Sequence, residues 1–130
     1  MVHQDRTTVS ERIDRSCELL RSAYRRRIIY ALRRGGPASV GELADVVTAV
    51  GLVEDRQRAI ASLVHTHLPK LSEAGVIEYE GAEETVSLAE SVEELEPLLT
   101  VAARQEVDNE HLPFSGGNRR TDAVAGKVPE

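Results

Sequence analysis

One change of hydrophobic period constrains the fold of this chain more than any other feature. From Ser39 to Leu71 the apolar residues recur every three to four positions, as they do on one face of a helix. After Gly75 they give way to two short β-branched runs, 76–79 and 85–88, which are separated by five residues that include a glycine. This order predicts helices followed directly by a β-hairpin.

Capping signals divide the helical part into separate helices. Ser39 and Glu42 have the spacing of a capping box, in which each side chain bonds the backbone amide of the other residue. Gly35-Gly36-Pro37 ends the helix before it, because proline cannot continue a helix, and Gly75 is the stop of a later one. The signals and periods together predict helices at 9–21, 22–34, 39–50 and 55–73, and a final helix at 91–104 after the hairpin.

Two prolines lie inside predicted helices. Pro69 lacks an amide hydrogen and its ring crowds the carbonyl of His65, at a cost of about 3 kcal/mol in an ordinary helix interior. We therefore expect a bend or an early end between His65 and Pro69. Pro97 predicts either a kink or a helix that starts properly at Glu96.

The two ends of the chain differ in composition from its middle. Residues 1–8 are polar, and residues 105–130 are rich in Gly, Pro, Asn, Asp and Arg, so both segments are expected to be disordered. The span 9–104 is then one mainly α domain with a β-hairpin wing, a winged helix-turn-helix. No apolar run approaches the roughly 20 residues of a membrane span, and the N-terminus has no signal-peptide pattern. We expect a cytoplasmic protein without a membrane partner.

Three segments carry a resemblance to a known family. They are Arg25-Arg26-Arg27-Ile28-Ile29-Tyr30-Ala31-Leu32, Ser39-Val40-Gly41-Glu42-Leu43-Ala44, and His67-Leu68-Pro69-Lys70-Leu71-Ser72-Glu73-Ala74-Gly75-Val76-Ile77. In this order they resemble winged-helix repressors of the arsenical-repressor type. The third segment is more similar still to winged-helix domains from halophilic archaea. The resemblance implies a dimeric, DNA-binding transcription regulator. The chain lacks the cysteine motifs of the metal-sensing members, so the resemblance implies no metal switch.

The predicted helix 55–73 holds the candidate base-reading residues. In a helix-turn-helix the second helix of the motif lies in the major groove, where Arg bonds guanine and Ser, Thr and His bond base edges. The polar face of this helix carries Arg56, Arg58, Ser62, His65, Thr66 and Lys70. We predict that these residues bind DNA, although such a face can also serve only to solvate a helix.

The basic run from Arg25 to Arg34 and the residue His67 each allow two interpretations. The arginines between Arg25 and Arg34 could contact DNA phosphates, with Arg25 and Arg26 as the candidates, or could balance nearby carboxylates. His67 lies on the apolar face. We expect it to be a core histidine bonded to a backbone group rather than a metal ligand.

Charge is divided unevenly along the chain and leaves two functions open. Residues 1–75 contain 12 basic and 9 acidic residues, whereas residues 76–130 contain 4 and 13. The predicted wing tip, residues 80–84, has three carboxylates that DNA phosphates would repel. Abundant carboxylates with scarce lysine resemble proteins of halophiles, whose molar salt screens charges within about 3 Å. The alternative to a regulator of double-stranded DNA is a protein-interaction module on the same fold.

The predicted dimer would use the terminal helices, 9–21 and 91–104. Their apolar residues could form the dimer surface or could cover the domain's own core: Val9, Ile13, Leu95, Leu98, Leu99 and Val101. The sequence contains no glycine-rich phosphate loop, nucleophile elbow or metal-spaced His/Cys set. We therefore expect no enzymatic activity, no cofactor, no metal and no small-molecule ligand.

Overall fold

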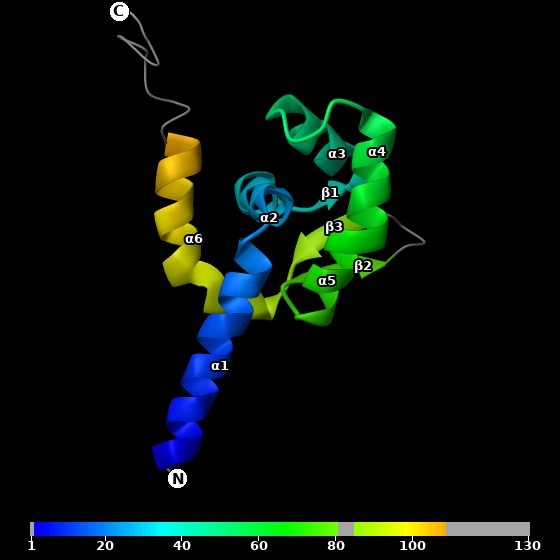
Figure 1. Cartoon of the computed structure of the whole chain (residues 1–130). Coiled ribbons are helices and arrows are strands. Elements are labelled where there is room, and N and C mark those ends of the chain that lie inside the picture. Colours follow the sequence, from blue (N-terminus) through cyan, green and yellow to red (C-terminus); the bar gives the residue numbers. More distant parts are fainter. Residues whose placement is uncertain (1, 81–84, 109–130) are drawn as a thin grey trace, which may run out of the picture. The chain divides into compact units, whose positions relative to one another are not determined.

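The computed structural model describes residues 2–80 and 85–108 of the chain (Figure 1). The chain divides into two compact units, residues 1–99 and residues 100–130. In the second unit the described part is helical and comprises residues 100–108. The boundaries predicted for a domain at 9–104 remain a prediction. None of the helices within the described residues is long and apolar enough to cross a membrane.

Helices make up most of the first unit. Its elements are α1 (Val2–Leu20), α2 (Ala23–Gly35), β1 (Ala38–Ser39), α3 (Val40–Ala49), α4 (Arg56–Ser62), the π-helical turn η1 (Leu63–His67), α5 (Leu68–Glu73), β2 (Ile77–Glu80), β3 (Thr85–Leu88), the 3-10 helix η2 (Glu90–Leu95) and the start of α6 (Glu96–Ala103). A second π-helical turn, η3 (Arg104–Asp108), follows α6.

Local side-chain contacts fix where several helices begin. The predicted capping box is confirmed, because the Ser39 amide donates to Glu42 Oε1 at 2.9 Å and the Glu42 amide donates to Ser39 Oγ at 3.0 Å. Asp55 accepts from the amide of Gln57 at 3.0 Å and so caps α4. Ser22 caps α2 by accepting from the Arg25 amide. A break between the first two helices therefore falls at residues 21–22.

The first helix is longer than predicted. We expected it at 9–21 with a disordered segment 1–8 ahead of it, but α1 is helical from Val2 onwards. Neither glycine nor proline occurs between Val2 and Leu20, so nothing in the sequence ends the helix there. Of the predicted disordered tail 105–130, the part up to Asp108 is helical and the rest lies outside the described residues.

The distortion expected near Pro69 is a widened turn of the predicted helix 55–73. The chain passes from α4 through η1 into α5 without leaving the helical region, and the Leu68 amide donates to the Leu63 carbonyl, five residues back. Such a π turn inserts one extra residue into the helix. The π turn ends at His67, two residues before Pro69, which occupies the first turn of α5, where a missing amide hydrogen costs little.

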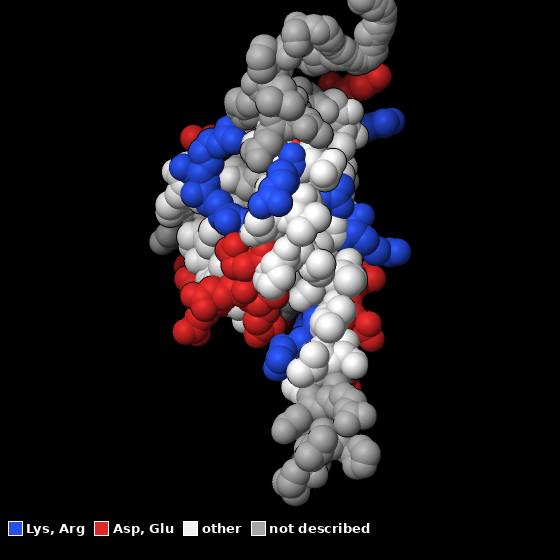
Figure 2. All heavy atoms as spheres, turned by 90° about the vertical axis from the view of Figure 1, so that its left-hand side faces the viewer, with Lys and Arg blue, Asp and Glu red and all other residues white. Residues whose placement is uncertain are grey.

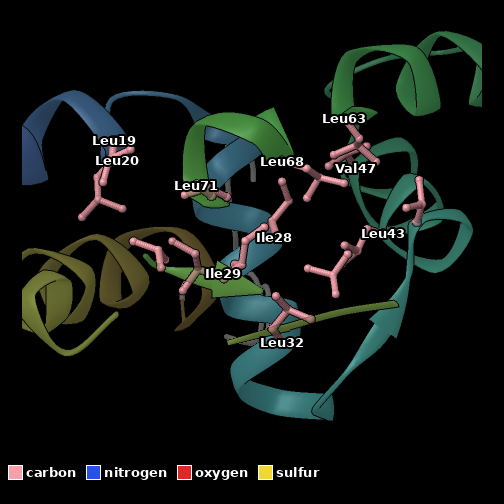
Figure 3. Close-up of a cluster of buried hydrophobic side chains, with 14 of the residues drawn as sticks. Leu19, Leu20, Ile28, Ile29, Leu32, Leu43, Val47, Leu63, Leu68 and Leu71 are labelled. Carbon is pink, nitrogen blue, oxygen red and sulfur yellow. The ribbon is translucent and has the colours of Figure 1, made fainter. Parts of the chain in front are cut away.

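The hydrophobic core lies between α2 and the elements around it. Ile28, Ile29 and Leu32 of α2 point toward Leu43 and Val47 of α3 and toward Leu68 and Leu71 of α5 (Figure 3), and all are buried. Leu95 and Leu99 are also buried in this core, so both serve the domain itself and not a dimer surface. By contrast, Val9, Ile13 and Leu98 are exposed.

The predicted hairpin is confirmed and belongs to a three-stranded antiparallel sheet. The strand order is β1-β3-β2, with Ile77 opposite Leu88 and Ala38 opposite Val86. β1 was not predicted, because a strand of two residues has no periodicity to detect. The wing-tip residues 81–84 lie outside the described residues. The fold is mainly α with a small β wing, of the winged helix-turn-helix type, as predicted.

Candidate nucleic-acid interface

The column α4–η1–α5 occupies the place of the second helix of a helix-turn-helix. It follows α3 after a short connection and packs against it (Figure 1). Arg58, His65 and Thr66 lie on its exposed side, and Ser62 is half-buried. Within the described residues, none of these four side chains is engaged in a hydrogen bond or ion pair. They therefore present their polar groups to solvent.

The two other predicted residues of this helix are ion-paired. Arg56 Nε lies 2.8 Å from Asp45 Oδ1, which joins the start of α4 to α3. The Arg56 guanidinium also lies over Gly41, where a Cβ atom would approach it to 2.6 Å. Lys70 Nζ lies 3.3 Å from Glu18 Oε2 of α1. Both pairs are exposed, so each contributes about 1 kcal/mol or less and can exchange its partner.

The structure corrects the prediction that Arg25 contacts phosphate. Only 5% of this residue is exposed, because it lies on the buried face of α2. Its Nε donates to the Leu19 carbonyl at 2.7 Å and its Nη2 donates to the Glu18 carbonyl at 2.9 Å. These carbonyls belong to the last turn of α1, where the helix itself offers no donor. Arg25 therefore caps α1 and cannot reach DNA.

Arg26 also bonds the backbone at the junction of α1 and α2. It is half-buried, and its Nη1 donates to the Leu20 carbonyl at 2.6 Å. At the other end of α2, Arg33 and Arg34 are exposed, and Arg33 Nη2 lies 3.2 Å from Glu96 Oε1. The predicted basic run thus divides into a structural start and an exposed end.

His67 is half-buried, but its partner is not the backbone group that we predicted. Its Nδ1 lies 3.2 Å from Arg25 Nη1, and its ring stacks on Tyr24 with the centroids 4.7 Å apart. Burial lowers the pKa of His67 below its usual value of 6.5, and the charges of Arg25 and Lys70 lower it further. Sequence reasoning missed this contact, although Arg25, Ile28, Ile29 and Leu32 share the spacing of one buried helix face.

Acidic side chains occupy other surfaces of the first unit. The exposed residues of β2 are Glu78 and Glu80, and η2 carries exposed Glu90, Glu93 and Glu94. Figure 2 shows a group of acidic side chains near the middle of the face that it draws, with basic side chains above and below it.

The fold defines a winged helix-turn-helix domain whose second motif helix has an exposed polar face. The chain belongs to the family described as a domain of unknown function, DUF7344, whose model matches residues 17–87, from the end of α1 into β3. Neither a curated protein nor a solved structure matches the chain.

Proposed function

We propose that this protein is a transcription regulator that binds double-stranded DNA, with α4–η1–α5 as its recognition helix. The observation that carries the proposal is a set of exposed polar side chains on that column that have no partner among the described residues: Arg58, His65 and Thr66. Arginine can bond both acceptors on the major-groove edge of guanine, and Thr and His can bond base edges. Ser62 lies beside them at the edge of the same face.

The length of this face suits a major groove. Arg58 and Thr66 are eight residues apart, which is about 12 Å along a helix at 1.5 Å per residue. That distance corresponds to about three to four base pairs at about 3.4 Å each. Arg56 and Lys70 flank the face, and their exposed ion pairs can give way to phosphate contacts.

The proposal includes a homodimer in the cytoplasm. Two recognition helices on one side of a dimer read two half-sites of an operator. Val9 and Ile13 on α1 are 45% and 54% exposed, and they lie on the same face of the helix as buried Leu20. We therefore propose that α1 contributes to the dimer surface. We also propose kinship with the arsenical-repressor type of regulator and with the winged-helix domains of halophilic archaea.

Selection from a random duplex pool in molar KCl tests the function. The wild-type protein is compared with the double variant Arg58→Ala/His65→Ala and with Arg12→Ala, an exposed arginine of α1 that serves as the control. We expect an enriched motif with the wild type and the control, and its loss with the double variant. Enrichment that survives in the double variant would move the contact surface elsewhere. No enrichment at any salt concentration would contradict the proposal.

A protein-interaction module is the second candidate, and the acidic surface favours it. β2 is an edge strand of the sheet, and it presents Glu78 and Glu80 to solvent. An exposed strand edge can pair with an added strand, and the carboxylates would select a basic one. Calorimetric titration with a lysine-rich β-strand peptide tests this function. Binding that Glu78→Gln/Glu80→Gln weakens, without any DNA binding, would favour the module.

A further inference from the structure

A polar junction joins the end of α1 to the wide turn of the recognition helix. Arg25 is its centre, because one guanidinium contacts the carbonyls of Glu18 and Leu19 on α1 and the Nδ1 atom of His67 in η1. Tyr24 stacks on the other side of the junction against the His67 ring, with an angle of 17° between the ring planes. The consecutive helices α1 and α2 thus meet the sequence-distant turn η1 at one buried cation.

The hydrogen bond between Arg25 and His67 requires a neutral imidazole. The guanidinium can only donate, so Nδ1 must accept and the ring proton must sit on Nε2. A proton on Nδ1 would remove the acceptor and would place two cations about 3 Å apart. Burial lowers the pKa of His67, which keeps the neutral form stable near neutral pH.

The charges around His67 would not stabilise its protonated ring. Among the described residues, the charges that act on it are Arg25 of α2 and Lys70 of α5, and Tyr24 of α2 stacks on its ring. Glu18 of α1 is the carboxylate near these two cations, and it already pairs with Lys70 at 3.3 Å. Protonation of His67 would therefore disrupt the junction rather than tighten it.

We infer that Tyr24, Arg25 and His67 are positioning residues that hold the wide turn of the recognition helix against the end of α1, and that a proton on His67 releases this turn. The inference rests on the proposed function, since it concerns the regulation of the same DNA-reading face. His65 and Thr66 belong to the same π turn as His67. π turns are rare and depend on the contacts around them, so loss of the junction would reposition the side chains of His65 and Thr66.

A pH titration of the labelled protein by NMR tests the junction without DNA. In the wild type we expect the amide signals of Leu63–His67 and those of Leu19 and Leu20 to shift together as the pH is lowered. The midpoint of these shifts should equal that of the His67 ring signals and should lie below about pH 6.5. The variant His67→Asn keeps an acceptor near the Nδ1 position but has no ring to protonate, so the amide signals of Leu19 and Leu20 should stay in place. Shifts confined to the immediate neighbours of His67 would overturn the inference. The wild-type titration decides this even if the variant does not fold.

Binding of a selected duplex at about pH 7.5 and about pH 5.5 tests the consequence for DNA. The comparison of the wild type with His67→Asn isolates the effect of residue 67, because every other side chain is the same in the two proteins. We expect acidification to weaken binding by the wild type about tenfold more than binding by the variant. Equal pH dependence in the two proteins would overturn the inference. If no duplex binds even at about pH 7.5, the proposed function fails, and the NMR titration alone decides the junction.

Discussion

Substitution of Gly75 by alanine should destabilise the domain through two separable effects. Gly75 ends α5 and starts the wing, with a φ of +77°. Its amide donates to the Ser72 carbonyl at 3.0 Å, and its carbonyl accepts from the Ser91 amide at 3.1 Å. A Cβ atom added here would lie 2.9 Å from Ser91 Oγ. The substitution therefore combines an unfavourable backbone conformation with a close contact.

A matched glycine separates these two effects. Gly51 has a φ of +85°, and a Cβ atom added there would meet nothing within 4 Å. Gly51→Ala should thus cost only the left-handed conformation, about 1–2 kcal/mol. At position 75 the Ser91 hydroxyl must also leave its rotamer, which adds about 1 kcal/mol. The backbone of Ser91 cannot move away without breaking the hydrogen bond from its amide to the Gly75 carbonyl.

Thermal and urea unfolding measure both costs. We expect Gly75→Ala to melt about 4–8 °C below Gly51→Ala, the shift that 1 kcal/mol gives in a domain of this size. Ser91→Ala removes the hydroxyl, so in its background Gly75→Ala should cost no more than Gly51→Ala does in the wild type. Equal losses for the two glycines in the wild type would refute the steric part of this reasoning.

Three further predictions concern stability. Arg25→Met leaves two carbonyls of α1 without a donor and should cost about 3 kcal/mol in urea unfolding, whereas Arg34→Met, at an exposed site, should change stability by less than about 0.5 kcal/mol. Ser39→Ala removes the capping box of α3 and should cost about 1 kcal/mol by the same assay. Acidification should reduce stability through His67: its pKa is lowered in the folded state, so the unfolded chain binds the proton first. The stabilising contribution of neutral His67 is complete above about pH 6.5 and is lost as the pH falls through the lowered pKa. Between about pH 7.5 and about pH 5.5, His67→Asn should therefore lose less free energy of unfolding than the wild type.

The parts of the fold that depend on local chemistry could be predicted from the sequence. The capping box at Ser39, the stop at Gly75 and the β-branched hairpin each act within a few residues, and each is present in the structure. The proline at position 69 predicted a distortion, but not its form. Whether a helix bends, ends or gains an extra residue depends on what packs around it, which local sequence does not contain.

The errors of the site prediction arose where tertiary contacts override residue type. An arginine in a basic run is normally exposed, yet Arg25 is buried because the last carbonyls of α1 lie within its reach. The same fact explains why His67 has a side-chain partner instead of a backbone one. The ion pair of Lys70 joins α5 to the distant helix α1, and that of Arg56 joins consecutive helices across a loop, so neither pair could be predicted from helical spacing.

The most direct test of the proposed function is an NMR titration of the labelled protein with a short DNA duplex. The account predicts that the amide signals of Arg58, Ser62, His65 and Thr66 move in a saturable way, while those of Glu90–Leu95 in acidic η2 stay unchanged. The perturbations should weaken as salt is added, because phosphate contacts release counterions. Signals of α4–η1–α5 that remain in place at every salt concentration would contradict the claim that this helix reads DNA.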